Sequence, residues 1–240
     1  MEHKKISCLI SAWNKHDITA VHVREIMNST RIPDEIIVVN DGGTPDLKDK
    51  LMALEKKTKI IYAEILPPKI LWNYTGARNL GIWLSTGDYI SLEDNDHIPD
   101  RNYYEECVKM FEEHPEISRL KTEKRWVVSE EDVLTKPFEK WEVMGKRPCH
   151  QDVAFNRREV FLQLKGYDER FAGEYGWCST DLNRRLNRAG IACGNVGHQF
   201  VVYSEKTRGL SYRNFRLART QKGTQTTHGI LNFEYNYCEL

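Results

Sequence analysis

Short apolar runs alternate with longer amphipathic stretches over about the first hundred residues of the chain. Runs rich in apolar and β-branched residues of this length are typical of strands in a buried parallel sheet. Four such strands are predicted, over residues 6–11, 35–40, 59–65 and 88–93. Between them, leucines recur at helical spacing from Leu47 to Leu54, and residues 75–86 are expected to form a helix. Strands that alternate with helices predict parallel βαβ units with right-handed connections.

The second part of the chain gives a weaker pattern. Residues 100–114 are predicted to form an amphipathic helix, and residues 118–150 are too mixed to assign. A further helix is expected over residues 179–190, capped by Ser179 or Thr180 and stopped by a glycine.

The chain is expected to divide at two places. Residues 1–205 are expected to form one domain made of two halves, over 1–114 and 115–205. Residues 206–240 are basic, aromatic and rich in turns, so they are predicted to be a tail or a lid rather than a second core.

Polar stretches follow three of the predicted strands. They are "SAWN" after the first strand, "NDGGT" after the second and "EDNDH" after the fourth. In open α/β sheets, ligands bind beyond the carboxyl ends of the parallel strands. These three stretches are therefore expected to meet at one edge of the sheet and to form a ligand site.

Composition narrows the class of protein. The 240 residues include 35 basic and 35 acidic side chains, a net charge of zero that argues against binding to nucleic acid through bulk charge. Six cysteines occur without a CxxC pair, which favours reduced thiols in a cytoplasmic protein over a disulfide scaffold. No apolar run is long enough to span a membrane or to act as a signal peptide, although a peripheral membrane contact is compatible with this composition.

The acidic stretch at residues 93–100 allows three interpretations. A calcium loop would need a glycine at its sixth position, where Pro99 stands, so this interpretation is the weakest. The stretch could also be a solvated turn in which Asp100 caps the next helix. The third interpretation is that Asp94 and Asp96 turn toward one Mg²⁺ or Mn²⁺ ion that also binds substrate phosphates.

Four blocks of sequence together resemble a known family. They are "SCLISAWNKHD", "DEIIVVNDGGTPD", "NYTGARNLGIWLSTGDYISLEDNDHIPD" and "LKGYDERFAGEYGWCSTDLNRRLNRAG". Their order and spacing over residues 6–195 are similar to those of the family 2 glycosyltransferases. The resemblance implies an α/β fold of the Rossmann-like GT-A type, with a mostly parallel central sheet flanked by helices. It also implies that residues 1–114 form the nucleotide-binding half of the domain and residues 115–205 the acceptor half.

The resemblance also implies roles for residues at the donor site. Ser11 corresponds to a contact with the nucleoside, Asp41 to the aspartate that binds the uracil ring, and Arg78 to an arginine near the nucleotide. Asp94 and Asp96 correspond to the metal-binding Asp-x-Asp motif, in which the second aspartate is usually the direct ligand. The intervening Asn95 is counted with the nucleotide contacts.

The acceptor side departs from the family pattern. A carboxylate must take the proton from the attacking acceptor hydroxyl, and the family usually supplies it from a Glu-Asp pair before the helix. This chain has Cys178-Ser179 at that place, and neither side chain is a good base without an activator. Asp181 is the first alternative, although a helix N-terminus would lower its pKa, and Glu174 is the second. The third possibility is that activity has been lost.

Other side chains have roles that follow only from the resemblance. His198 lies where many relatives place a third metal ligand, although a lone histidine is more often structural. His150 and Asp152 precede a block that lines the sugar or acceptor pocket in relatives. Tyr175 and Trp177 could stack on a sugar or simply pack together.

Taken together, these features predict an inverting glycosyltransferase for glycan biosynthesis. It would move a sugar from a nucleotide-diphospho-sugar, most simply a UDP-sugar, to a hydroxyl of a glycan, a lipid-linked sugar or a protein, with Mn²⁺ or Mg²⁺. One alternative is a sugar-1-phosphate nucleotidyltransferase, but "SAWNKHD" lacks the glycines of its phosphate loop. Another is a non-catalytic nucleotide-sugar-binding protein, which would be consistent with Cys178-Ser179.

Overall fold

The computed structural model describes residues 3–44, 46–67, 70–148, 150–203, 209–226, 231 and 233–240. The strands are β1 (Ile6–Ala12), β2 (Glu35–Asn40), β3 (Lys59–Ile65), β4 (Tyr89–Asp94), β5 (His97–Pro99), β6 (Arg119–Val128), β7 (Gly145–Arg147), β8 (Ala154–Arg157), β9 (Cys193–Val202) and β10 (Tyr235–Glu239). The α-helices are α1 (His16–Ile26), α2 (Asp46–Met52), α3 (Tyr74–Leu84), α4 (Tyr103–Glu113), α5 (Glu130–Thr135), α6 (Arg158–Leu164), α7 (Cys178–Arg188) and α8 (Tyr212–Thr220). Two short 3₁₀ turns cover Phe138–Lys140 and Glu169–Phe171.

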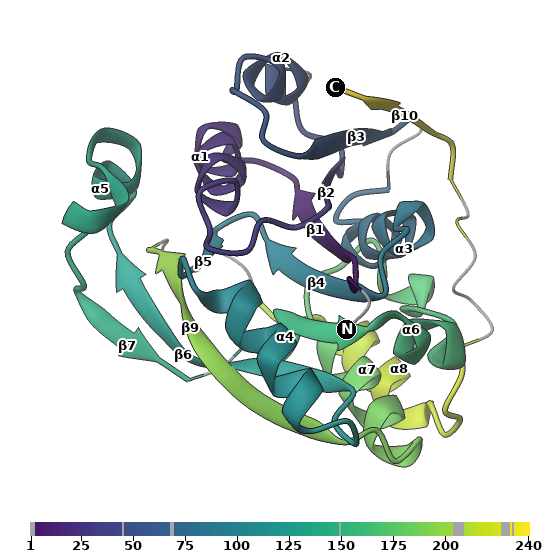
Figure 1. The fold of residues 1–240 in the computed structure, drawn as a ribbon. Coiled ribbons are helices and arrows are strands. Elements are labelled where there is room, and N and C mark those ends of the chain that lie inside the picture. Colours follow the sequence, from purple (N-terminus) through teal and green to yellow (C-terminus); the bar gives the residue numbers. More distant parts are fainter. Residues whose placement is uncertain are drawn as a thin grey trace.

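The strands form one sheet in the order β10-β3-β2-β1-β4-β8-β6-β9-β5, with β7 paired to β6 (Figure 1). The four strands predicted from the apolar runs, β3, β2, β1 and β4, are all parallel. Beyond β4 the pairing is mixed, because β8 runs antiparallel to both β4 and β6 while β6 and β9 are parallel. The prediction of an α/β fold with a parallel central block is confirmed.

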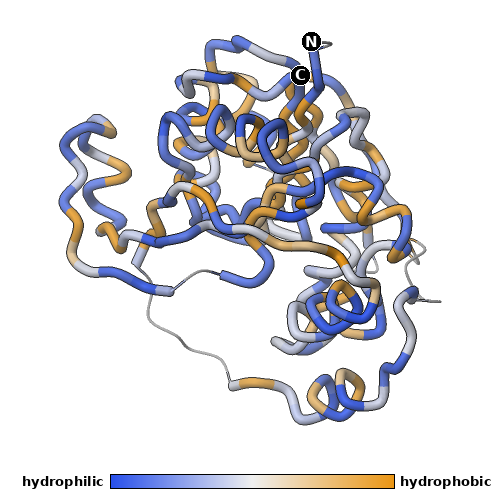
Figure 2. The backbone as a smooth tube through the Cα atoms, turned by 60° about the horizontal axis from the view of Figure 1, so that its bottom comes forward, coloured by the Kyte–Doolittle hydropathy of each residue, from blue (hydrophilic) through white to orange (hydrophobic). Residues whose placement is uncertain are grey.

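Helices cover both faces of the parallel block, and strand β1 shows why. Its alternate side chains point to opposite faces, so Cys8 and Ile10 pack with α1, α2 and α4. Leu9, between them, packs on the other face with the apolar side chains of α6 and α7. Figure 2 shows the resulting pattern, with apolar stretches gathered in the middle of the molecule. Each fully buried aliphatic side chain of this kind stabilises the fold by about 1.5–3 kcal/mol.

Helix α3 approaches the sheet closely because of one small residue. A Cβ atom on Gly81 would overlap the side chain of Leu9 in β1. At the start of the helix, the Asn73 side chain accepts a hydrogen bond from the backbone N–H of Gly76 at 3.2 Å. Tyr74 and Arg78 lie one turn apart on this helix and so share a face.

The start of helix α7 differs from the prediction. Neither Ser179 nor Thr180 caps it, since the helix already begins at Cys178. The capping position is Trp177, which adopts the left-handed conformation (φ 70°) and makes no side-chain cap hydrogen bond. The Ser179 side chain lies within the first turn, and its hydroxyl bonds to Asp152 instead of to the helix backbone.

The C-terminal residues add to the same domain. Strand β10 pairs antiparallel with β3 and forms the edge of the sheet, and α8 packs near α7. The predicted boundary at residue 205 lies outside the described residues, so the division into domain and tail stays a prediction. Residues 118–150, left unassigned from the sequence, contain β6, α5 and β7. Among the described residues, no helix combines the length and the apolar character needed to cross a membrane.

Candidate functional site

The polar ends of the parallel strands meet at one edge of the sheet, as predicted. Ser11 in β1 is in register with Val39 of β2 on one side and with Asp94 of β4 on the other. Directly after β2, the backbone N–H of Asp41 donates to the carbonyl of Ala12 at 2.7 Å. Ser11 and Asp41, both predicted to contact the nucleoside, are therefore buried next to the Asp-x-Asp stretch.

Asp94 is held by two side chains of helix α3. The Arg78 guanidinium donates from Nη2 to Oδ1 of Asp94 at 2.5 Å, and the Tyr74 hydroxyl donates to the same oxygen at 3.1 Å. Burial alone would raise the pKa of Asp94, but the charge of Arg78, together with His150, His97 and the Tyr74 hydrogen bond, outweighs burial and holds this pKa well below the usual range. Asp94 is therefore a fixed negative charge at the strand end, and the structure brings two predicted site residues into direct contact.

Asp96 lies beside a histidine that the sequence analysis missed. His97 Nδ1 is 2.8 Å from Oδ1 of Asp96 and 3.9 Å from Oδ2 of Asp94. Burial would raise the pKa of Asp96, yet the hydrogen bond and charge of His97, together with the charge of Lys15, lower it below its ordinary value. Lys15, at the start of α1, places its ammonium 3.5 Å from Oδ2 of Asp96. The signal for His97 was its position directly after the Asp-x-Asp motif.

These three side chains form a possible cation site. One ligand atom each from Asp94, Asp96 and His97 can be chosen so that all lie within 4.8 Å of one another. Two carboxylates are the oxygen donors that Mg²⁺ and Mn²⁺ prefer. The Arg125 guanidinium donates from Nη1 to Nε2 of His97 at 2.9 Å, so in this arrangement Nδ1 of His97 donates to Asp96 and the ring positions the carboxylates. The two carboxylates therefore fit a divalent cation, with His97 beside them.

Glu93, left undecided from the sequence, lies behind this site and takes no part in it. It is fully buried, accepts from Ser91 at 2.6 Å and from Gln199 at 2.7 Å, and burial raises its pKa to about 8. A carboxyl group that is neutral near pH 7 adds no negative charge to the cluster. The concentration of charge at residues 93–100 is thus smaller than the sequence suggests.

Asn95 ties the acidic turn to the loop after β1. Its Nδ2 donates to the Asn14 carbonyl at 2.5 Å and to the Thr19 hydroxyl at 3.3 Å. This contact fixes the turn that presents Asp94 and Asp96 on either side of Asn95. The expected contact between Asn95 and the nucleotide stays a prediction.

His198 lies apart from the Asp94–Asp96–His97 group. Its Nε2 is 2.7 Å from Oδ2 of Asp100, and its ring stacks on Trp126 with centroids 4.0 Å apart. Asp100 in turn accepts from the backbone N–H of Asn102 at 3.1 Å, just before α4 begins. The third-ligand role predicted for His198 stays a prediction, and the histidine beside the two aspartates is His97.

The two carboxylates predicted as the base are both paired with arginines. Asp181 is buried, and its Oδ2 accepts from Nε of Arg185 at 2.8 Å within α7. Burial raises the pKa of Asp181 above its ordinary value, against the opposing charge of Arg185. Glu174 is half exposed, lies 3.3 Å from Arg213 Nε and accepts a hydrogen bond from Ser211. The assignment of either as the base stays a prediction.

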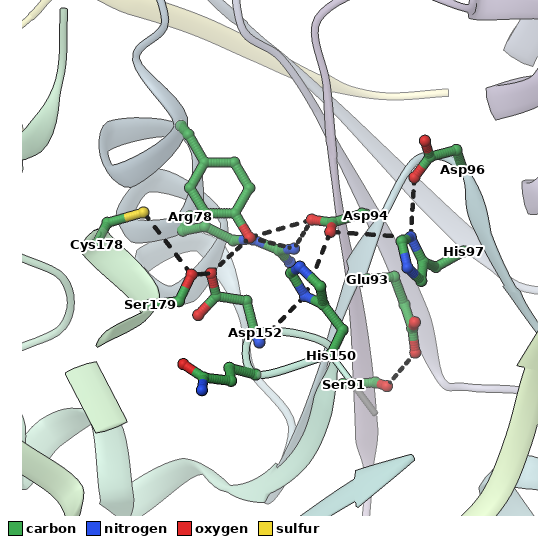
Figure 3. Close-up of polar contacts among 12 residues, drawn as sticks. Arg78, Ser91, Glu93, Asp94, Asp96, His97, His150, Asp152, Cys178 and Ser179 are labelled. Atoms are coloured by element: carbon green, nitrogen blue, oxygen red, sulfur yellow. Dashed lines mark hydrogen bonds and ion pairs between the residues drawn. The ribbon is translucent and has the colours of Figure 1, made fainter. Parts of the chain in front are cut away.

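A second buried carboxylate lies on the other side of Tyr74. Asp152 accepts hydrogen bonds from the hydroxyls of Ser179 and Tyr167, the latter at 3.3 Å, and its Oδ2 lies 3.3 Å from the Tyr74 hydroxyl, whose single proton can go to Asp94 or to Asp152. His150, two residues earlier, places Nδ1 3.8 Å from Oδ2 of Asp94. Figure 3 shows His150, Asp152 and Ser179 together with the Arg78–Asp94 pair. The structure thus brings the predicted pocket residues His150 and Asp152 to the metal-binding candidates.

Three aromatic rings are in contact beside the loop after β1. Trp72 makes edge-to-face contacts with Trp13 at 5.6 Å and with Tyr175 at 5.1 Å between centroids. Trp177 instead packs on Phe215 of α8 at 4.8 Å. Tyr175 therefore belongs to a cluster of rings, and its stacking on a sugar stays a prediction.

Known proteins share both the sequence pattern and the fold. An uncharacterised glycosyltransferase of Rickettsia bellii is 33% identical over 110 residues, which cover 46% of this chain but only 15% of that protein. Two solved structures share the fold. S. aureus TarS in complex with UDP-GlcNAc matches with a TM-score of 0.66 and 11% identity over 96% of this chain and 67% of its own. The mannosyltransferase PcManGT of Pyrobaculum calidifontis, in complex with GDP-Man and Mn²⁺, matches with a TM-score of 0.60 and 16% identity over 91% of this chain and 61% of its own.

These likenesses establish a GT-A glycosyltransferase fold. The sequence model described as "Glycosyl transferase family 2" matches residues 7–163, from β1 through the Asp-x-Asp stretch to α6. That region is more than half of the chain, and it contains the strand ends and helix α3 that build the site. The chain belongs to glycosyl transferase family 2.

Proposed function

We propose that the chain transfers a sugar from a nucleotide-diphospho-sugar to a hydroxyl acceptor, with inversion at the anomeric carbon and with Mn²⁺ or Mg²⁺. The observation that carries the proposal is the group of Asp94, Asp96 and His97 at the carboxyl end of β4. Substrates of open α/β sheets bind at this edge. Family membership and the fold shared with PcManGT in complex with GDP-Man and Mn²⁺ support it.

The side chains of the site suit a diphosphate. Asp94 and Asp96 would hold the divalent ion, which stabilises the negative charge that develops on the departing nucleoside diphosphate. Arg78 fixes Asp94 through one oxygen, Oδ1, so that Oδ2 remains on the side of His97 and His150. Lys15, which is 27% exposed in its side chain, adds a positive charge 3.5 Å from Asp96 that can face a phosphate oxygen.

The nucleoside would lie over the ends of β1 and β2. We place the base against Asp41 and the nucleoside next to Ser11, which are buried beside Asp94 in the sheet edge. TarS, which has the same fold, binds UDP-GlcNAc, and this supports UDP as the first nucleotide to test. The loop that holds Asn95 would close one end of this nucleotide site.

The second candidate function is binding of a nucleotide-sugar without transfer. It is favoured by one observation, namely that Cys178 and Ser179 stand at the start of α7 where the resemblance leads one to expect carboxylates. The thiol of Cys178 is a poor substitute, since burial raises its pKa far above the ordinary value. Only a measurement of turnover separates the two functions.

The test is release of nucleoside diphosphate from a donor panel. UDP-glucose, UDP-galactose, UDP-GlcNAc and GDP-mannose are each incubated with the protein and Mn²⁺, with water, glycerol and free sugars as acceptors, and an EDTA control is run beside them. We expect release from at least one donor that stops in EDTA, and NMR of the product should show the inverted anomer. Metal-dependent binding without any release would establish the second function and contradict the first.

A further inference from the structure

Ser179 in the first turn of α7 donates its hydroxyl proton to a carboxylate. The hydrogen bond runs from Oγ of Ser179 to Oδ2 of Asp152, in the loop before β8, as Figure 3 shows. A serine at the start of a helix usually bonds to the free backbone N–H groups of that turn. Here the hydroxyl is committed to Asp152, so the contact is a tertiary feature that joins two segments 27 residues apart.

Asp152 differs from the other carboxylates near the site because, within the described part of the chain, it is bonded to hydroxyl groups and not paired with an arginine. Asp94, Asp181 and Glu174 each have an arginine within ion-pair distance. Asp152 is 1% exposed, and among the described residues its side chain has no ion-pair partner and is bonded only to the hydroxyls of Ser179, Tyr74 and Tyr167. A buried carboxylate that is bonded to hydroxyls, and has no cation within ion-pair distance, is placed to receive a proton from one of them.

The pair also lies beside the proposed donor site. The Tyr74 hydroxyl is 3.3 Å from Oδ2 of Asp152 and 3.1 Å from Oδ1 of Asp94, so one phenol oxygen links the two carboxylates. Ser179 is partly exposed whereas Asp152 is 1% exposed. Of the two bonded groups, the Ser179 hydroxyl is therefore the one that an acceptor can reach.

We propose that Ser179 and Asp152 together form the proton acceptor for the transfer, in place of a single carboxylate. The inference rests on the proposed function. As the acceptor oxygen bonds to the anomeric carbon, the bond from that carbon to the diphosphate oxygen breaks and its electron pair leaves with the nucleoside diphosphate. The acceptor proton passes to Oγ of Ser179 while the Ser179 proton passes to Oδ2 of Asp152, so that Asp152 activates a hydroxyl that is a weak base alone.

The test compares variants of the full chain in the nucleoside diphosphate assay with Mn²⁺. Ser179→Ala and Asp152→Asn should each lower release by about 10²–10⁴-fold, the usual contribution of a general base. Their affinity for UDP in Mn²⁺, measured by calorimetry, should stay within about threefold. The Ser179→Ala/Asp152→Asn double variant should be no slower than either single variant, because groups that act as one unit are not additive.

A relocated carboxylate separates catalysis from a structural role. In the Asp152→Asn background, Ser179→Asp places a carboxylate directly at the exposed position and should restore release at least tenfold. A purely structural defect would not be repaired in this way. Cys178→Ala is the matched control, because Cys178 is next to Ser179 in the chain and its Sγ lies 4.0 Å from Oγ of Ser179. In this variant, release of nucleoside diphosphate should change by less than about threefold.

The outcomes distinguish the two proposals. If Asp152→Asn or Ser179→Ala releases nucleoside diphosphate at the native rate, the pair is not the proton acceptor, while the transferase function stands. The proposal also fails if the double variant loses release by the product of the two single-variant factors. It fails as well if Ser179→Asp in the Asp152→Asn background does not restore release. If the native protein releases nothing from any donor, the proposed function itself fails and the pair with it.

Discussion

The guanidinium of Arg78 lies 2.5 Å from Oδ1 of Asp94, and its side chain is completely buried. Because Arg78 is on α3 and Asp94 ends β4, this ion pair joins the helix to the strand end that carries the proposed cation site. Burial raises the cost of leaving either charge alone. The pair is therefore both a structural contact and the fixed point from which the site is built.

Removal of this guanidinium should lower the free energy of unfolding. Arg78→Met leaves Asp94 buried without its partner, which typically costs about 3–5 kcal/mol of unfolding free energy. Urea unfolding followed by circular dichroism measures the change. Lys109→Met, which breaks an exposed pair with Glu113 at 3.8 Å, serves as the control and should leave the midpoint unchanged. Equal midpoints for the two variants would contradict the account of the Arg78–Asp94 pair.

Variants of Asp181 and Glu174 test whether either of them, rather than the Ser179–Asp152 pair, is the proton acceptor. Asp181→Asn breaks the buried pair with Arg185, so we expect a loss of about 3–5 kcal/mol in unfolding free energy. We expect the folded fraction to release nucleoside diphosphate at a rate close to native, since Asp181 is bonded to Arg185 and not to any side chain of the cation group. Glu174→Gln should likewise retain release. Loss of release by either variant, with intact UDP affinity, would restore that residue as the base.

The fully buried His22 should make stability depend on pH. Burial lowers its pKa from 6.5 to about 3, so between these values the unfolded chain binds a proton that the folded protein does not. Stability contributed by the neutral ring is thus fully present above pH 6.5 and is lost as the pH falls toward 3, by about 1.4 kcal/mol per unit.

The His22→Leu variant isolates this contribution. Unfolding free energies of both proteins, measured from pH 7 to pH 4, should diverge because the variant lacks the titrating ring. Below pH 6.5, the slope of unfolding free energy against pH should be larger for the native protein, by the amount that corresponds to uptake of about one proton on unfolding. Parallel curves would mean that His22 is not responsible.

Gly81 should not tolerate a methyl group although it lies in a helix. Alanine has the higher helix propensity by about 1 kcal/mol, but its Cβ would overlap Leu9 and push α3 away from β1. We expect Gly81→Ala to lower the unfolding free energy by about 1–3 kcal/mol. Gly145→Ala, where the added atom has nothing within 4 Å, is the control. A more stable Gly81→Ala variant would show that helix propensity outweighs this contact.

Sequence patterns predicted the parallel block because its strands are buried on both faces. Strands β1 and β2 have no exposed side chain, so they consist mainly of apolar residues and lack the alternation of a half-exposed strand. Strand β6, by contrast, alternates irregularly between buried and exposed positions and contains Lys121, Glu123 and Lys124, so no apolar run marks it. Strand β10 is mostly exposed, and its pairing with β3 depends on a contact between distant segments.

The site was predictable only in part for the same reason. Asp94 and Asp96 stand in a recognisable motif after a strong strand, and Arg78 stands in a helix next to it in sequence. The bond from Ser179 to Asp152 requires α7 to lie against the loop before β8, which no local pattern indicates. The prediction that Ser179 caps the helix was wrong, because the helix begins one residue earlier and the Ser179 hydroxyl bonds to Asp152.

The most direct test of the central claim is calorimetric titration of UDP into the protein with Mn²⁺ and with EDTA. The claim is that Asp94 and Asp96 hold a divalent ion against the diphosphate of the donor. We predict binding in Mn²⁺ that EDTA abolishes and that Asp96→Asn abolishes equally, whereas Asp100→Asn, in the same acidic stretch but bonded to His198, binds as the native chain does. UDP affinity in Mn²⁺ that is undiminished by Asp96→Asn would contradict the claim.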